Sequence, residues 1–262
     1  SKKPACFFLT YLFGSVPNVE LILNICKKYN VTLIEDISQN IGSKFNNKYL
    51  GTFGNASIYS SSLTKYVDAY SGSFVLTDNK KLSHELKLFY KKLNSPSKYR
   101  LRKIILKTLF FNLSLSKLIF SFFAYPILNL IKKLNKSLFK KIIEQKSSYK
   151  KNNVLFDYYF EKISFMQCKS IEFYLNRLNK LILERNSISE LLKQEIRSEI
   201  SNYDEILLNN FSDNDKFKSS DWQFLLKVSS TLKSQEILFD IGIETGITKL
   251  PNLAEAANIF LK

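Results

Sequence analysis

Short apolar runs alternate with amphipathic stretches along the first 93 residues of the chain. Apolar side chains at helical spacing predict one helix over 19–29 and another over 80–92. Short apolar runs bounded by polar residues are typical of buried strands, and they predict strands at Ala5–Leu9, Val31–Ile34, Ala56–Tyr59 and Phe74–Thr77. Because helices separate these strands, we expect an α/β fold with a mostly parallel sheet covered on both faces.

The sequence after residue 153 predicts fewer helices and strands. Apolar positions at helical spacing indicate one long helix over Phe165–Lys193. A small α/β region follows, with a strand at Trp222–Val228 and a helix at Leu232–Asp240 that ends at a left-handed Gly242.

Residues 95–153 differ from their surroundings and have the character of an insertion, rich in Leu, Ile, Phe and Lys and without glycine. Helices are expected at Lys103–Phe111 and Leu130–Ile143, and the longest uncharged run, Leu118–Ile131, is shorter than a bilayer requires. Three interpretations stay open. These helices lie in a membrane interface with lysine stems reaching outward, pack on protein, or form a re-entrant or spanning element.

The net charge of +16 and a pI near 9.6 favour anionic partners. Specific nucleic-acid recognition is disfavoured, because only five of the 39 basic residues are arginine and base readout relies on the guanidinium. Nonspecific nucleic-acid binding would rest on charge alone. The three scattered cysteines suggest neither a disulfide framework nor a metal site, so we expect a reducing cytoplasmic setting.

Several kinds of catalytic site are disfavoured, because the sequence lacks the residues that they need. No glycine-rich phosphate loop is present, and the single histidine, His84, lies in a polar stretch, which disfavours nucleotide hydrolysis and serine-histidine catalysis. Asp36, Ser60 and Lys65 remain, each just past the end of a predicted strand. Ligands of open parallel sheets bind at that edge, so a carboxylate, a hydroxyl and an amine are expected on one rim.

The residues around these three positions form a recognisable pattern. The chain reads IEDISQNIGSKF, then LGTFGNASIYSSSLTK, then YSGSFVLTDN. This resembles the DegT/DnrJ/StrS sugar aminotransferases in motifs and in spacing. The flanking segments FLTYLFGSVPNVELILNICKKYN, MQCKSIEFYLNRLNKLILERNSIS and LFDIGIETGITKLP are also similar to segments of that family.

The resemblance implies the aspartate-aminotransferase-like (type I) fold with pyridoxal 5′-phosphate as cofactor. It implies that Asp36 contacts the pyridine nitrogen, Gln39 the phenolic oxygen and Ser60 the phosphate. Lys65 would bind the cofactor covalently and act as the catalytic base, which separates the chain from the dehydratase branch that lacks this lysine. The family's Gly-Glu-Gly-Gly segment appears here as Tyr70-Ser71-Gly72-Ser73.

Each of the four residues also has a plain structural interpretation. Asp36 could be a strand-end turn residue, Ser60 a packed loop residue and Gln39 a surface amide, and Lys65 could be one more lysine among many.

From composition and resemblance together we expect four regions: the later part of a cofactor-binding domain (1–94), a basic apolar helical insertion (95–153), a connecting helix (154–196) and part of a small C-terminal domain (197–262). The resemblance implies that the chain begins about a hundred residues inside the family's length.

The expected function is transfer of an amino group from an amino-acid donor to a nucleotide-linked keto-sugar, in surface polysaccharide synthesis, by a homodimer. The alternative is an inactive, membrane-associated scaffold or partner that keeps the fold. Contact with the inner face of the membrane through residues 101–145 is compatible with both.

Overall fold

The computed structural model describes residues 4–143, 160–207, 216–243 and 245, and the chain divides into two compact units. One unit comprises Ser1–Thr108 and Phe156–Lys227, and the other comprises Leu109–Leu155 and Val228–Lys262. The four regions expected from composition stay a prediction.

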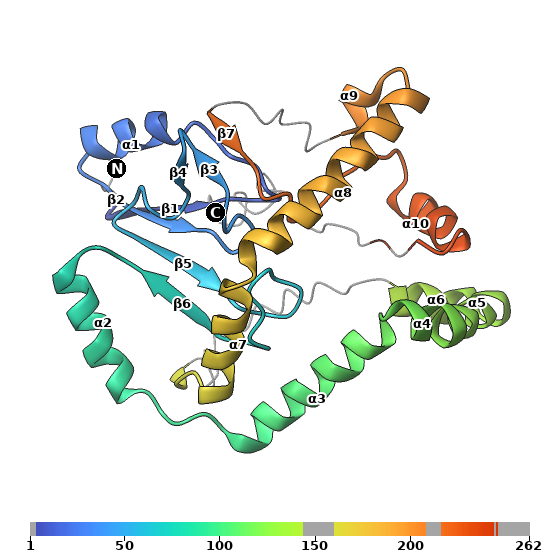
Figure 1. Ribbon diagram of the computed structural model, residues 1–262, viewed down its shortest axis with the longest axis horizontal. Coiled ribbons are helices and arrows are strands. Elements are labelled where there is room, and N and C mark those ends of the chain that lie inside the picture. Colours follow the sequence, from blue (N-terminus) through green and yellow to red (C-terminus); the bar gives the residue numbers. More distant parts are fainter. Residues whose placement is uncertain (1–3, 144–159, 208–215, 244, 246–262) are drawn as a thin grey trace, which may run out of the picture. The chain divides into compact units, whose positions relative to one another are not determined.

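A four-stranded sheet with the order β1-β2-β5-β6 forms the centre of the first unit (Figure 1). Its strands are β1 (Cys6–Thr10), β2 (Thr32–Asp36), β5 (Ala56–Ser60) and β6 (Ser73–Leu76). The first three are parallel, in a register that pairs Thr10 with Asp36 and Asp36 with Ile58. The expected α/β fold with a mostly parallel sheet is confirmed.

The last strand runs the other way. β6 pairs antiparallel with β5, so that Ser60 lies opposite Ser73. A parallel strand would need a crossover, usually through a helix, whereas the chain from 61 to 72 folds back and Ser61 N donates to Gly72 O. The sheet is therefore mostly parallel, as expected, with one antiparallel strand at this edge.

A second, three-stranded sheet has the order β4-β3-β7 and consists of β3 (Lys44–Phe45), β4 (Lys48–Tyr49) and β7 (Phe217–Lys218). β7 brings the segment after residue 216 against the first part of the chain. The strand expected at Trp222–Val228 is wrong, because pairing there is limited to one bridge between Leu207 and Leu226. A strand needs a continuous ladder, and the described chain provides no neighbour beyond that bridge.

Two helices of the first unit begin at asparagine caps. Asn18 and Asn79 accept hydrogen bonds from the first turns of α1 (Val19–Lys28) and α2 (Lys80–Lys92). The long helix expected over Phe165–Lys193 is wrong as one helix. It consists of α7 (Phe165–Leu175) and α8 (Leu178–Glu199), separated by a turn at Asn176 and Arg177 in which Arg177 N donates to Tyr174 O. The short α9 (Tyr203–Ile206) follows.

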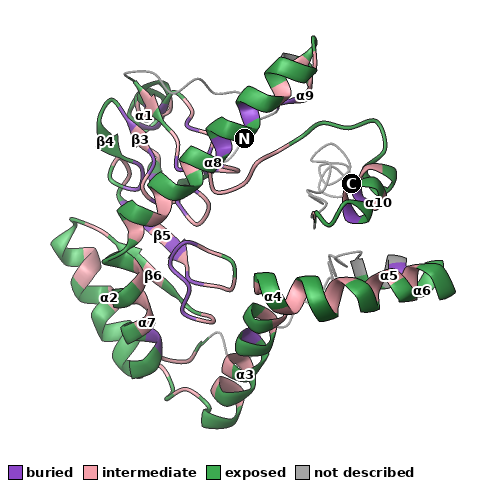
Figure 2. Ribbon diagram, turned by 45° about the vertical axis from the view of Figure 1, so that its right-hand side comes forward, coloured by how far each residue is buried: buried purple, intermediate pink, exposed green. Residues whose placement is uncertain are grey.

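The core of this unit lies around the ends of the strands, where most of the buried residues in Figure 2 gather. Tyr11, Ile37, Phe45, Tyr59 and Val67 belong to it, and apolar side chains at the start of α8 pack against them. The approach of α8 is close at Gly42, where an added Cβ would lie 2.2 Å from Ile182 Cδ1. Gly42 also has φ +89°, a backbone geometry that favours glycine.

The second unit is helical. α3 (Lys98–Ser114) enters it, and the remaining elements are α4 (Lys117–Ile119), the π-helical turn η1 (Phe120–Ala124), α5 (Tyr125–Leu134), α6 (Lys136–Ile143) and α10 (Thr231–Asp240). The rings of Tyr125 and Phe139 contact Phe239, and Lys132 forms an ion pair with Asp240. The C-terminal helix thus packs on the basic apolar segment. Gly242 has φ +83°, as expected from the sequence.

Taken singly, none of the helices in the described part of the chain has both the length and the apolar character that a membrane crossing requires. Two consecutive stretches, Lys98–Ser114 and Lys117–Leu134, meet these criteria only as a pair, with a bend of 64° between them.

Candidate active site at the carboxyl edge of the sheet

Two of the predicted site residues end neighbouring parallel strands. Asp36 is the last residue of β2 and Ser60 the last residue of β5. Asp36 Oδ1 accepts hydrogen bonds from Ser38 N at 3.0 Å and from Ser38 Oγ at 2.5 Å. Ser38 Oγ in turn accepts a hydrogen bond from Ser60 N at 3.0 Å. Ser38 therefore joins the two strand ends and fixes the orientation of the carboxylate.

The loop 61–72 that follows β5 is largely buried and carries Lys65. Tyr59, which is fully buried, accepts a hydrogen bond through its hydroxyl from Val67 N at 2.8 Å, and Ala69 N donates to Ser61 O. Thr64 and Tyr70 have φ of +77° and +67°. Residues other than glycine adopt this geometry at a cost, and such positions cluster at functional sites. Tyr70 is the position where the resembling family has glycine.

Lys65 is half-buried on this loop. Burial lowers the pKa of its ammonium below the usual lysine value, and the negative charge of Asp36 acts in the opposite direction by raising that pKa. The structure therefore brings the amine of Lys65 into the electrostatic field of Asp36, on the rim that Ser60 also borders. Lys65 Nζ forms no hydrogen bond with the described residues.

The indole ring of Trp222 contacts Lys65. Lys65 Nζ lies 3.9 Å from the centroid of the ring, and Trp222 Nε1 donates a hydrogen bond to Thr64 O at 3.2 Å. An ammonium over an indole face is favoured by the ring quadrupole. Trp222 thus covers the amine on one side and is tied to the same loop.

The segment before Trp222 is held firmly. Ser220 is fully buried and its backbone N donates to Ser43 Oγ at 2.9 Å, while Tyr66 donates its hydroxyl hydrogen bond to Ser220 O. Asp221, with φ +40°, forms an ion pair with the buried Lys193 of α8. Contacts to the sheet, the loop and α8 therefore fix where the indole lies.

Gln39, the third predicted cofactor contact, is oriented towards the end of β1. Its Oε1 accepts a hydrogen bond from Phe13 N at 2.9 Å, and its Nε2 donates none within the described part of the chain. The hydroxyl of Ser60 makes only a long 3.4 Å contact with Ser62 Oγ. The amide nitrogen of Gln39 and the hydroxyl of Ser60 can therefore form further hydrogen bonds with a ligand.

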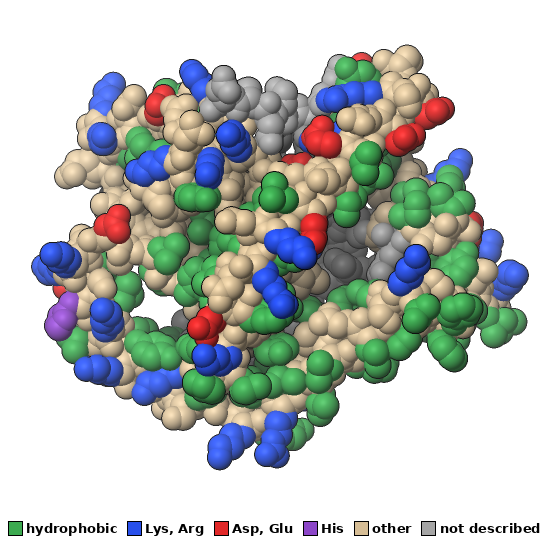
Figure 3. Space-filling view, in the orientation of Figure 1, with side chains coloured by type: hydrophobic (Ala, Val, Ile, Leu, Met, Phe, Trp, Pro, Cys, Tyr) green, Lys and Arg blue, Asp and Glu red, His purple; other side chains and the backbone are tan. Residues whose placement is uncertain are grey.

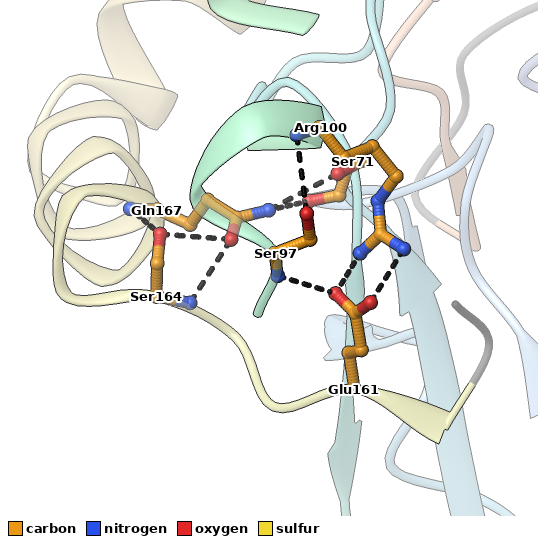
Figure 4. Close-up of polar contacts among 6 residues, drawn as sticks. All are labelled: Ser71, Ser97, Arg100, Glu161, Ser164 and Gln167. Carbon is orange, nitrogen blue, oxygen red and sulfur yellow. Dashed lines mark hydrogen bonds and ion pairs between the residues drawn. The ribbon is translucent and has the colours of Figure 1, made fainter. Parts of the chain in front are cut away.

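A network of polar contacts, drawn in Figure 4, supports the end of the Lys65 loop from α7. Gln167 Nε2 donates to Ser71 O at 2.9 Å and to Ser71 Oγ at 3.1 Å. Gln167 also closes the capping box of α7 with Ser164. Nearby, Arg100 and Glu161 form a bidentate ion pair. The helix that resembles the family's later segment is thereby attached to the loop 61–72.

A buried carboxylate organises the other side of β2. Glu35 is fully buried and accepts hydrogen bonds from Tyr11 Oη, Gly51 N, Phe53 N and Gly54 N, at 2.6–2.8 Å. A buried charge is tolerated only with such partners. These bonds tie the turn at 51–54 and β1 to the strand that ends in Asp36.

The groups on the rim fit a pyridoxal phosphate cofactor. Asp36 Oδ2 accepts no hydrogen bond from the described residues and can accept one from a protonated ring nitrogen, and Gln39 Nε2 can donate to an oxygen on the ring. Ser60 offers a hydroxyl for the phosphate, and Lys65 offers a half-buried amine. Among the described residues, no group of three or more His, Cys, Asp or Glu side chains could hold a metal ion. His84 is exposed on α2.

The sequence pattern missed Ser38, Gln167 and Trp222. Trp222 carried a usable signal, because it is the only tryptophan of the chain and follows three polar residues rather than beginning a regular strand. Ser38 and Gln167 carried none, since their roles depend on which segments meet in space.

A model of the DegT/DnrJ/EryC1/StrS aminotransferase family matches residues 3–114. A pleiotropic regulatory protein of Geobacillus stearothermophilus is 32% identical over 89 residues, which are 34% of this chain and 24% of that protein. GDP-perosamine synthase of Escherichia coli O157:H7 is 33% identical over 82 residues, which are 31% of this chain and 22% of that enzyme. The matched segment thus spans about a quarter of these relatives.

The fold is similar to that of E. coli GDP-4-keto-6-deoxy-D-mannose-3-dehydratase with bound hydrated PLP, with a TM-score of 0.60 and 18% identity. This likeness covers 100% of the chain and 57% of the dehydratase. At this identity it shows the fold alone, which is the expected aminotransferase type.

Proposed function

We propose that this chain belongs to an enzyme of the DegT/DnrJ/EryC1/StrS aminotransferase family, whose model matches residues 3–114, and that the enzyme aminates a nucleotide-linked sugar with pyridoxal 5′-phosphate as cofactor. The observation that carries the proposal is the environment of Lys65. A half-buried amine with a lowered pKa lies at the carboxyl edge of a parallel sheet, in the field of a carboxylate that ends the adjacent strand.

Each residue has a role that its surroundings support. Asp36 accepts a hydrogen bond from the ring nitrogen and keeps it protonated, since Ser38 holds the other carboxylate oxygen in place. Ser60 binds the phosphate, and Gln39 donates to the phenolic oxygen. Pyridoxal phosphate, when bound, supplies an electron sink for the pair released as the substrate Cα–H bond breaks.

Lys65 has two roles in this proposal. Its Nζ binds the cofactor covalently and, once an incoming amine has displaced it, moves a proton between the substrate Cα and the cofactor C4′. A lowered pKa suits both roles, because a larger fraction of the amine is neutral at a given pH.

The finer features of the proposal rest on the family resemblance. The substrate is a keto-sugar linked to a nucleotide, the amino donor is an amino acid such as glutamate, and the product serves surface polysaccharide synthesis. The name GDP-perosamine synthase supports a nucleotide-linked sugar. We propose a homodimer as the active form.

The test is covalent trapping of the cofactor in the full-length protein. After incubation with pyridoxal phosphate and reduction with borohydride, peptide mapping should place the added mass on Lys65. The cofactor bound to Lys65 should absorb visible light. The Lys65→Ala variant should lose both the adduct and this absorption, whereas Lys81→Ala, at an exposed lysine of α2, should keep both. Trapping that is unaffected by Lys65→Ala would show that the lysine assignment is wrong.

A folded protein that binds no cofactor in any of these forms would favour the non-catalytic, membrane-associated alternative. The exposed apolar and cationic helices of the chain are the observation behind that alternative.

A further inference from the structure

The segment from α3 to α6 has an unusual charge distribution. Residues 98–143 contain eleven lysine and arginine residues and no aspartate or glutamate. Between Thr108 and Ile131 the only charged residue is Lys117. The cations therefore stand at both ends of an apolar stretch, with one more near its middle.

The apolar side chains of α3 that are exposed lie on one face. Leu106, Leu109, Phe110 and Leu113 are spaced by three and four residues, and Leu106 and Phe110 are 67% and 74% exposed. In the space-filling view, hydrophobic side chains gather at the lower right, where α3 leads into the following helices (Figure 3). A face this exposed in the described structure is not part of a core.

α5 has one face that packs on α10 and another face that is exposed. Tyr125 and Lys132 contact α10, whereas Ile127, Leu130 and Leu134 remain 55%, 56% and 78% exposed at positions three and four residues apart. Leu118 and Phe122, between the two helices, are similarly exposed. The exposed apolar surface is thus distinct from the surface that packs on α10.

We propose that the exposed faces of α3 and α5, with the residues between them, bind the surface of an anionic lipid bilayer. Apolar side chains enter the boundary of the hydrocarbon, and the lysines contact the lipid headgroups. A second copy of the chain fits less well, because residues 98–143 carry cations and no acid, so two such segments would repel each other. A nucleic acid would leave the apolar side chains without a partner.

The same residues indicate that these helices lie on the surface of the bilayer rather than cross it. Lys117 stands just before the apolar turn η1, in the part of the helix pair that a crossing would carry into the hydrocarbon. An ammonium there is costly, whereas in the interface it reaches the headgroups. This inference is independent of the cofactor chemistry.

The test is co-sedimentation of the full-length protein with vesicles of phosphatidylcholine alone or mixed with phosphatidylglycerol. We expect binding to the mixed vesicles, at least about tenfold weaker binding to the neutral ones, and weakening by salt. Equal binding to both compositions, or none to either, would overturn the proposal.

Two pairs of variants test the two parts of the surface. Phe110→Ser with Phe122→Ser removes apolar contacts, and Lys107→Gln with Lys117→Gln removes exposed charges. Each pair should weaken binding at least about fivefold, on the order expected for one or two lost lipid contacts. The matched controls, Leu183→Ser with Leu191→Ser on α8 and Lys80→Gln with Lys81→Gln on α2, should bind like the parent.

The remaining outcomes also decide. Unchanged binding by the apolar pair would mean that charge alone attracts the protein, which contradicts the proposed insertion. Loss of self-association by that pair in gel filtration, without an effect on vesicle binding, would assign the face to a second copy. Circular dichroism confirms that each variant is folded before it is compared.

Discussion

Residues 32–72 and residues 98–136 use apolar side chains in different ways. In the first segment, Leu33, Ile37, Phe45, Tyr59 and Val67 are buried around a polar network that satisfies Glu35 and orients Asp36. In the second segment every charged residue is a cation, and most large apolar side chains are exposed. The first segment is stabilised by its own chain, whereas the second requires a partner to cover it.

The largest effect on stability is expected at Glu35. Glu35→Ala leaves the Tyr11 hydroxyl and three backbone N–H groups without their acceptor in a buried place. We expect a loss of about 3–5 kcal/mol in the free energy of unfolding, measured by urea denaturation. Tyr11→Phe removes only one of the four donors and should cost about 1 kcal/mol.

The control for this prediction is Glu85→Ala on the exposed side of α2, which should change stability by less than about 0.5 kcal/mol. A cost for Glu35→Ala no larger than that of the control would mean that the network does not stabilise the sheet edge.

Trp222 is expected to affect both stability and the chemistry of Lys65. Trp222→Ala should cost about 2 kcal/mol, as for a large, half-buried side chain. Removal of the ring has two opposite effects, because it admits water to the ammonium and also ends the contact with the indole face. Burial is the largest influence on this pKa, so the pKa of Lys65 should rise towards its usual value. The measurement is the pH midpoint of Lys65 acetylation, followed by mass spectrometry with exposed Lys81 as internal reference. An unshifted midpoint would show that exclusion of water by the ring does not dominate this pKa.

Asp36→Asn should move the same midpoint in the other direction. The charge of Asp36 raises the pKa of Lys65, so its loss should lower that pKa further. In the parent protein the midpoint for Lys65 should lie below that of Lys81, because burial disfavours the ammonium. Shifts of equal sign in Trp222→Ala and Asp36→Asn would contradict the electrostatic description of the site.

The sequence predicted the parts of the site that depend on local order. Apolar runs located β1, β2 and β5, and the placement of polar residues after them put Asp36, Ser60 and Lys65 at one edge. Those runs carry no information on strand direction, so they could not show that β6 is the antiparallel strand. The break at Arg177 was missed because neither glycine nor proline marks it. The contact between Trp222 and Lys65 joins residues far apart in the chain and could not be read from either neighbourhood.

Gln167 should have a moderate effect, since it joins α7 to the Lys65 loop. Gln167→Ala removes two hydrogen bonds to Ser71 and half of the capping box with Ser164. We expect a loss of about 1–2 kcal/mol in urea denaturation. Gln194→Ala, at an exposed glutamine of α8, is the matched control and should stay within about 0.5 kcal/mol of the parent. Equal effects of the two substitutions would mean that α7 does not support the loop.

The smallest effect on stability is expected for an exposed apolar side chain of the second segment. Phe110 is 74% exposed on α3, whereas Phe139 of α6 is 1% exposed and packs on Phe239. Phe110→Ala should therefore change the free energy of unfolding by less than about 0.5 kcal/mol, while Phe139→Ala should cost about 3–5 kcal/mol. The substitution is the same in both, so the difference reports burial alone. Urea denaturation without lipid measures both. A cost at Phe110 close to that at Phe139 would show that protein already covers this face, which would leave nothing for a bilayer to bind.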